Sequence, residues 1–122
     1  MNKIKILTKT VQMEAELNET KTAKLICKLL PIESAVNIWG EEIYFSIPVK
    51  AELENGVEVV QEGDIGYWPT GNAFCIFFGK TPVSTEKEIK PASPVMLIGK
   101  LIGNPKKFKK VKNGEKIILD KF

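Results

Sequence analysis

The sequence predicts a mainly β fold, a closed antiparallel β-barrel of about eight strands capped by one helix and a second short helix. Short segments in which apolar and polar residues alternate dominate the chain, and this period is typical of strands with one buried face. Ala73–Phe78 is apolar on both faces and must be buried on both sides. Many strands with only two helical segments favour a barrel made from one domain, residues 1–122.

The first thirty residues predict two strands followed by the larger helix. Apolar and polar residues alternate in Lys3–Lys9 and again in Val11–Leu17. In Glu19–Leu30 the period changes, so that lysines share one helical face and aliphatic side chains cover the other. Asn18 or Thr20 can cap the start of this helix, and the proline that follows it ends it.

The middle of the chain predicts more strands and a tight hairpin. Ala35–Trp39 and Ile43–Lys50 have the alternation of one or two strands, with a break between them. Asn55-Gly56 lies between Ala51–Glu54 and Val57–Gln61, and this dipeptide is the strongest short-range signal for a two-residue hairpin turn.

The last third of the chain predicts a long loop, a strand, a short helix and a closing strand. Residues 79–94 contain three prolines among small and charged residues, which indicates an irregular loop. A strand follows at Val95–Ile102. Asn104 then caps a short helix that begins with proline and ends near Val111. Ile117–Leu119 forms the last strand.

The residue inventory excludes many kinds of catalytic site. The chain has no histidine and no arginine, and all 18 of its basic residues are lysine. Ser–His and Cys–His nucleophile pairs and histidine-ligated zinc or haem sites are therefore excluded. We expect no catalytic residues, no metal and no cofactor. Cys75 has apolar neighbours and is expected to be an inert buried thiol.

The charge is distributed unevenly along the chain. Residues 1–99 carry 10 lysines and 13 acids, whereas residues 100–122 carry 8 lysines and 2 acids. The basic segment 106–112 suggests a nucleic-acid accessory protein, but its lysines also fit the solvated face of a short helix around Phe108, which makes nucleic acid the less favoured partner. No apolar run approaches the ~20 residues of a membrane span. We expect a cytoplasmic protein with no membrane partner and two free thiols.

Aromatic residues concentrate in the segment Gly63–Gly79, which we interpret as a rigid turn before the doubly apolar strand. Trp68 can form the flat wall of a groove, and Asn72 can supply a polar anchor there. The other interpretation is that Tyr67 and Trp68 fill one end of the barrel, while Asn72 only supplies the turn conformation. Trp39 and Tyr44 have the same two interpretations. Four acids near glycine turns fit solvated turns better than a catalytic pair: Glu41, Glu42, Glu62 and Asp64.

Three long motifs give the chain a resemblance to a known family. They are WGEEIYFSIPV (Trp39–Val49), EGDIGYWPTGNAFCIFFGKTPVS (Glu62–Ser84) and KPASPVMLIGKLIG (Lys90–Gly103). They resemble the small prokaryotic cyclophilin-like family, whose members share the cyclophilin barrel and are largely uncharacterised. The resemblance implies the cyclophilin order of elements over nearly the whole chain.

The resemblance also implies a relation to peptidyl-prolyl isomerases. The cyclophilin signature Phe-His-Arg-x-x-Pro would fall on Ile43–Pro48, which places Phe45 at the position of the arginine. We therefore expect a module that binds a small molecule or a proline-containing peptide without strong catalysis. A weak or altered isomerase is the alternative. The candidate groove residues are Tyr44, Phe45, Tyr67, Trp68, Asn72 and Phe74.

Isomerase activity is predicted to be weak or absent. Rotation about an X–Pro bond is accelerated by a donor that stabilises the twisted amide, and loss of one preorganised donor typically costs about 10²–10³ in rate. A protease-coupled assay on a proline peptide, run beside a true cyclophilin, measures this difference. Turnover comparable with that of the cyclophilin would contradict the prediction.

Overall fold

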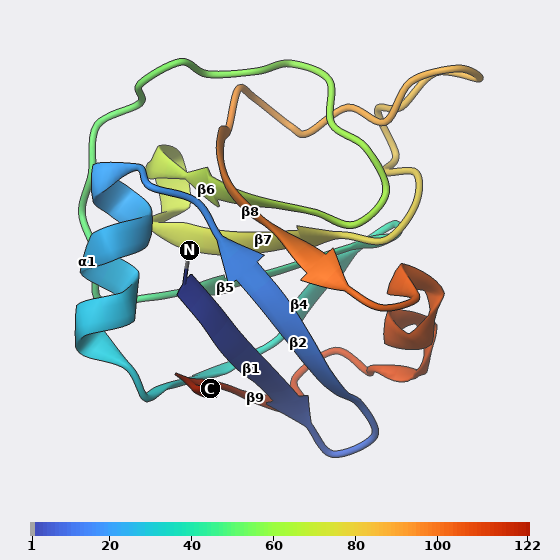
Figure 1. Cartoon of the computed structure of the whole chain (residues 1–122). Helices are drawn as coiled ribbons and strands as arrows, with labels where there is room; N and C mark the ends of the chain where they lie inside the picture. The colour runs from blue at the N-terminus through green and yellow to red at the C-terminus, as the bar shows by residue number, and fades with distance from the viewer. Residues whose placement is uncertain (1) are drawn as a thin grey trace.

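Nine antiparallel strands form a nearly closed barrel in this computed structural model, which describes residues 2–122 (Figure 1). Their order around the barrel is β3-β9-β1-β2-β8-β6-β7-β5-β4. The strands are β1 (Asn2–Thr8), β2 (Gln12–Leu17), β3 (Ile32–Ala35), β4 (Asn37–Trp39), β5 (Glu42–Ser46), β6 (Asp64–Trp68), β7 (Ala73–Phe77), β8 (Met96–Ile102) and β9 (Lys116–Lys121). The helices are α1 (Lys21–Leu29) and the 3-10 helices η1 (Pro69–Gly71) and η2 (Pro105–Lys110).

One continuous stretch of chain closes the barrel. Its first half, β3, pairs with β9, and its second half, β4, pairs with β5. Between them, the Val36 N–H donates to the Glu115 carbonyl at 2.9 Å. The Ser34 hydroxyl donates to the Ser46 carbonyl at 3.0 Å and joins β3 directly to β5. Since β3 and β4 act as one strand, the predicted antiparallel barrel of about eight strands is confirmed.

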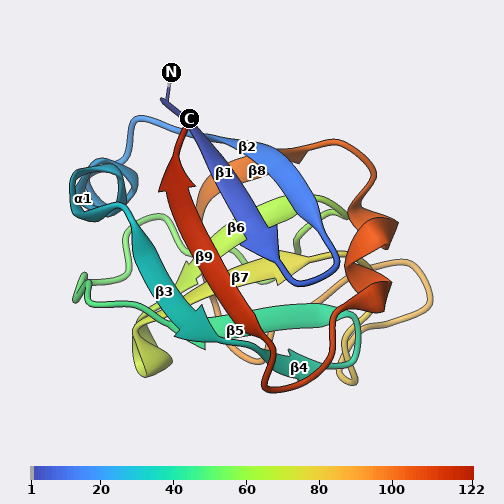
Figure 2. The ribbon, with the colours of Figure 1, turned by 90° about the horizontal axis from the view of Figure 1, so that it is seen from below.

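Helical segments cover the two ends of the barrel, α1 at one end and η2 at the other (Figures 1 and 2). Thr20 caps α1, because its hydroxyl accepts from the Ala23 N–H at 3.2 Å. Ala23 and Ile26 bury the apolar side of α1 in the barrel core, as its periodicity predicts. At the other end η2 buries Phe108 in the same core. The second helix is a 3-10 helix of six residues.

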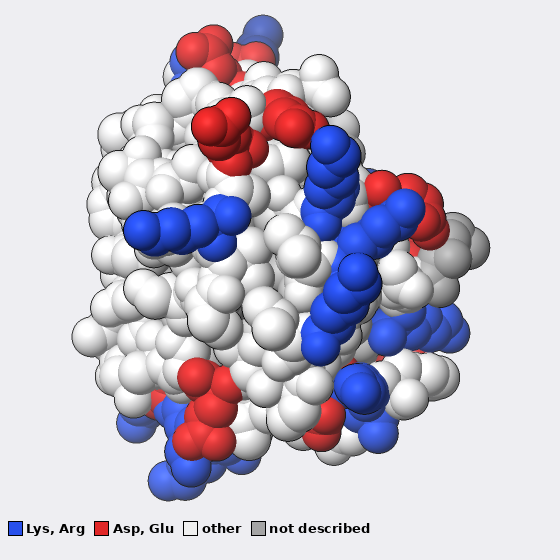
Figure 3. Space-filling view, turned by 90° about the vertical axis from the view of Figure 1, so that its left-hand side faces the viewer, with Lys and Arg blue, Asp and Glu red and all other residues white. Residues whose placement is uncertain are grey.

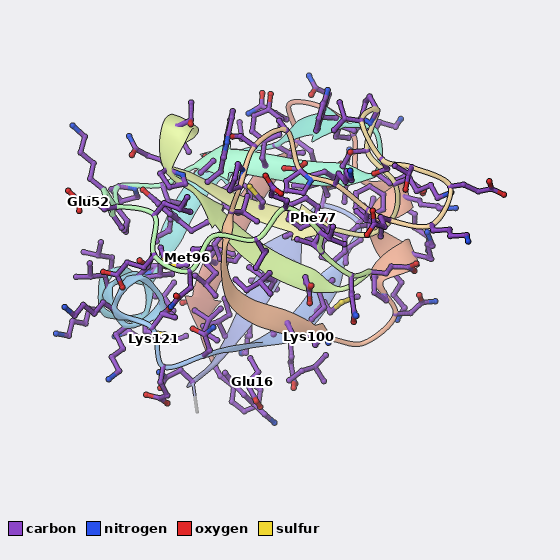
Figure 4. All side chains as sticks on the ribbon, turned by 90° about the horizontal axis from the view of Figure 1, so that it is seen from above. Glu16, Glu52, Phe77, Met96, Lys100 and Lys121 are labelled. Carbon is purple, nitrogen blue, oxygen red and sulfur yellow. The ribbon has the colours of Figure 1, made fainter. Side chains whose placement is uncertain are left out.

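A second, smaller apolar cluster lies on the outer face of β7. The segments 50–63 and 79–95 cross this face and join each other through bridges between Val57 and Val95 and between Val60 and Ile89 (Figures 1 and 4). Phe77 is fully buried beneath them. All five residues of β7 are buried, which confirms that this strand has no polar side.

Two predictions between residues 51 and 68 are wrong. Asn55 does adopt a left-handed turn conformation, with φ of +52°, but the flanking segments do not pair as a hairpin. The second segment instead pairs with Val95 and Ile89, because this places Val60 in the buried cluster on the outer face of β7. Residues 64–68, expected as part of a turn, form the strand β6 between β7 and β8.

Charged side chains of both signs are spread over the face on the α1 side of the molecule, with a broad uncharged area among them (Figure 3). Within the part of the chain that the structure describes, no helix has the length and apolar character needed to cross a bilayer.

The Gly40 turn, which joins β4 to β5, is expected to tolerate no side chain. Its φ is +61°, and an added Cβ would lie 2.9 Å from the Lys80 carbonyl oxygen. Gly114 also has a positive φ, of +87°, but has open space around it. Gly114→Ala should cost only the backbone strain, about 1–2 kcal/mol. Gly40→Ala should cost at least ~1 kcal/mol more because of the clash, and urea unfolding of both variants measures the difference. Equal losses would contradict this assignment.

Candidate functional site

A cavity of about 280 Å³ opens on the outer face of the barrel, where the segments that cover β7 end. Strands β4, β5 and β6 supply one side of it, and the stretch 91–95 supplies the other. The lining residues are Trp39, Glu42, Tyr44, Trp68, Pro91, Ala92 and Val95.

The alternation of β5 explains which side chains reach the cavity. Glu42 and Tyr44 are two residues apart and therefore point to the same face of the sheet. Ile43 and Phe45 point the opposite way and are buried in the barrel core. Trp39 lies opposite Glu42 in the β4–β5 pairing and completes this side of the cavity.

The aromatic wall is held in a defined geometry. The rings of Tyr44 and Trp68 meet edge to face, with centroids 6.2 Å apart and planes at 80°. The indole N–H of Trp68 donates to the Ser93 hydroxyl at 2.6 Å. This bond satisfies the polar edge of the indole and ties β6 to the opposite wall. Because the N–H already has a partner, Trp68 offers a ligand mainly its apolar ring surface.

Glu42 is the acidic group of the cavity and has an unusual environment. Its side chain is 5% exposed, and its Oε1 has no hydrogen-bond partner among the described residues. Burial disfavours the charged form and raises the pKa of Glu42 to about 7, although a hydrogen bond with the Cys75 thiol partly opposes this shift. The carboxyl group is therefore partly ionised near neutral pH.

Cys75 is buried beneath this carboxyl group on β7. Burial, together with the negative charge of Glu42, raises the pKa of the Cys75 thiol well above its usual value. A thiol in this state is a poor nucleophile, because the thiolate is the reactive form. Cys27 is also free, so the two cysteines form no disulfide.

Of the six residues expected to form a groove, the structure places Tyr44 and Trp68 in the wall of the cavity. Phe45 and Phe74 instead stack inside the barrel, with ring centroids 5.2 Å apart. Their strands alternate, and these positions face inward, so neither ring can meet a ligand in the cavity.

Tyr67 and Asn72 also have structural roles. Tyr67 is fully buried, and its hydroxyl donates to the Val49 carbonyl at 2.6 Å. The Ala51 N–H donates to the same hydroxyl at 3.2 Å. Asn72 adopts a left-handed conformation, with φ of +47°, at the end of η1. These two residues fix the chain that follows β5 and do not line the cavity.

The four acids considered together in the sequence do not form one group. Glu42 alone lines the cavity, Asp64 lies 3.9 Å from Lys100 Nζ, and the other two pair with the basic segment. Glu41 points away from Glu42, and its carboxylate lies 3.7 Å from Lys106 Nζ and 3.5 Å from Lys109 Nζ. Glu62 also lies 3.6 Å from Lys106 Nζ. These ion pairs neutralise part of the basic segment 106–112. Within residues 2–122, no group of three or more potential ligands could hold a metal ion.

Sequence reasoning underestimated Glu42 and did not consider the wall formed by Pro91, Ala92 and Val95. The alternation of Glu42 with Tyr44 indicated that both share a face. It did not indicate that loops would cover that face, because the covering contacts connect residues far apart in the sequence.

Comparisons with known proteins agree with this fold. The sequence profile of the Cyclophilin-like family matches residues 2–120. A hypothetical protein from Archaeoglobus fulgidus, known from a solution structure, is 38% identical to this chain; the match covers 99% of this chain and 95% of that one, with a TM-score of 0.84. A structure of McbB in complex with tryptophan is 14% identical, with coverage of 97% and 44% and a TM-score of 0.71. Among curated proteins, none matches this chain.

The Glu42 carboxyl group should make the stability of the protein depend on pH. Because its pKa rises from 4.5 to about 7 on folding, the folded state holds the extra proton between these values, and stability falls as the pH rises through about 7. Glu42→Gln removes this ionisation. The difference in the free energy of unfolding, variant minus wild type, should therefore increase by on the order of 2 kcal/mol from pH 4.5 to pH 8.

Denaturant unfolding at several pH values measures this change. Glu41→Gln is the matched control, since it removes the same charge from a neighbouring residue that does not line the cavity. The control should follow the wild-type curve. A constant difference between Glu42→Gln and the wild type across this pH range would contradict the assignment.

Proposed function

This chain belongs to the cyclophilin-like family, and on that premise we propose that it is a binding module for a small, largely apolar molecule, without strong catalytic activity. The observation that carries the proposal is the aromatic cavity on the outer face of the barrel, with Trp39, Tyr44 and Trp68 in its wall. At about 280 Å³, the cavity is near the lower end of the ~300–1,000 Å³ typical of ligand sites. That volume suits a single-ring compound or an amino-acid-sized molecule.

The groups around the cavity support binding rather than turnover. Glu42 and Tyr44 are the titratable residues in its wall, and they provide no nucleophile paired with a base. The thiol beneath them stays protonated. A carboxyl group with a pKa of about 7 can accept or donate one hydrogen bond near neutral pH, which is sufficient to orient a ligand.

The likeness to McbB supports the shared fold alone, because the two chains are 14% identical. McbB was seen in complex with tryptophan, so tryptophan is a reasonable first member of a set of probes for this cavity. We also propose that the protein acts in the cytoplasm, with both of its thiols free, as in a reducing compartment.

Ligand binding should be visible in the intrinsic fluorescence of the protein. The chain has two tryptophans, and both line the cavity. A set of small aromatic compounds, including phenylalanine, should therefore contain members that change the emission in a saturable way, while tryptophan, which fluoresces itself, is followed by NMR titration. Trp68→Ala removes one wall and should weaken their binding at least about tenfold, with Trp39 remaining as the reporter.

Phe122→Ala is the matched control, because it removes an aromatic ring that is 62% exposed at the end of the chain. Both variants should stay folded, as judged by circular dichroism. If no compound binds, or if compounds bind equally well to both variants, the cavity is not the binding site.

A further inference from the structure

One oxygen of the Glu42 carboxyl group has no hydrogen-bond partner among the described residues. This atom, Oε1, is buried in the wall of the cavity. Buried polar atoms without a partner are rare in folded proteins, because each loses its hydrogen bonds to water without a replacement. Because Glu42 lines an empty volume and not only packed core, a ligand in that volume is the source of a partner that the structure offers its carboxyl group.

The surroundings of this oxygen favour a positive charge in the ligand. Three aromatic rings share the cavity with it: Trp39, Tyr44 and Trp68. The face of an aromatic ring attracts cations, and sets of such rings recognise ammonium groups. Among the described residues, no lysine lines the cavity, so the carboxylate has no internal counter-ion there.

We propose, building on the function proposed above, that the ligand is a small organic cation, an amine or quaternary ammonium compound with an apolar body, whose charged group lies between Glu42 and the aromatic rings. Other ligand chemistries fit less well. An anion would be repelled by the ionised carboxylate. A neutral apolar molecule would fill the volume but leave Oε1 without a hydrogen bond. The free-energy cost of burying this polar atom would then remain.

The other groups around Glu42 agree with this polarity. The titratable side chains near it are the Cys75 thiol from β7 and that of Tyr44, which lines the same cavity from its own strand. Neither carries a positive charge. From the covering segment, the cavity receives Pro91, Ala92 and Val95, which are apolar. A bound cation would thus be the one positive charge at this site, and it would favour the ionised form of the carboxyl group.

Two probes of nearly equal shape, benzylammonium and benzyl alcohol, test the charge of the ligand. Their dissociation constants are measured by tryptophan fluorescence and by NMR titration, at pH 8 and constant ionic strength, where Glu42 is mainly ionised. We expect the wild type to bind benzylammonium at least tenfold more tightly than benzyl alcohol. Glu42→Gln should reduce this ratio to the part that the aromatic rings alone supply, whereas Glu41→Gln, at a half-buried ion pair outside the cavity, should preserve it.

The outcomes separate this inference from the proposed function. If benzyl alcohol binds as tightly as benzylammonium, and both depend on Trp68, the cavity binds ligands but the inference of a cation is overturned. If the preference for benzylammonium is undiminished in Glu42→Gln, the carboxylate is not the recognition group and the inference is again overturned. If neither probe binds and the aromatic compounds tested above also do not bind, both the inference of a cation and the proposed function are overturned.

Discussion

The site depends on the burial of β7 on both of its faces. The inner face contributes Phe74 and Ile76 to the barrel core, and the outer face presents Cys75 and Phe77. An exposed outer face of this kind would be an apolar patch in the middle of the barrel wall, so the chain must cover it. Two long segments do so, and the cavity lies beside them, between residues 91–95 of the second segment and the neighbouring strands β4, β5 and β6. The cavity is thus a consequence of how the barrel is covered.

The covering segments have little regular structure and are held by specific bonds. Inside the 79–94 loop, the Ser84 hydroxyl accepts from the N–H groups of Thr81 and Lys90, at 2.9 and 3.0 Å, and the Thr81 hydroxyl donates to the Lys90 carbonyl. The wall of the cavity is fixed just beyond this point, by the bond between Trp68 and Ser93 and by the bridge at Val95. Such anchoring allows a loop to present a preformed site, which lowers the entropic cost of binding.

Most of the fold could be predicted from the sequence, because its signals are local. Alternation located the strands at both ends of the chain, and Thr20 and the proline after α1 marked the helix ends. The hairpin predicted at Asn55-Gly56 is wrong because this dipeptide indicates only the turn. The strands with which the flanking segments pair depend on where their apolar residues become buried. The six groove candidates were chosen as aromatic or turn residues in two of the three motifs, Trp39–Val49 and Glu62–Ser84. Their division between core and cavity depends on which strand face is covered, and no local pattern carries that information.

The charge of the cavity bears on the comparison with an isomerase more directly than the missing arginine does. The position that the resemblance assigns to the arginine holds Phe45, whose ring lies inside the barrel, so no single substitution there would place a donor in the cavity. Of the polar groups in the cavity wall, Glu42 is an acceptor when ionised and repels a carbonyl oxygen. When protonated, it donates one hydrogen bond without a positive charge, and this stabilises a twisted amide less than a guanidinium group does. On the proposal made above, the cavity would recognise donors and cations, whereas rotation about a prolyl bond is accelerated by a donor to the substrate.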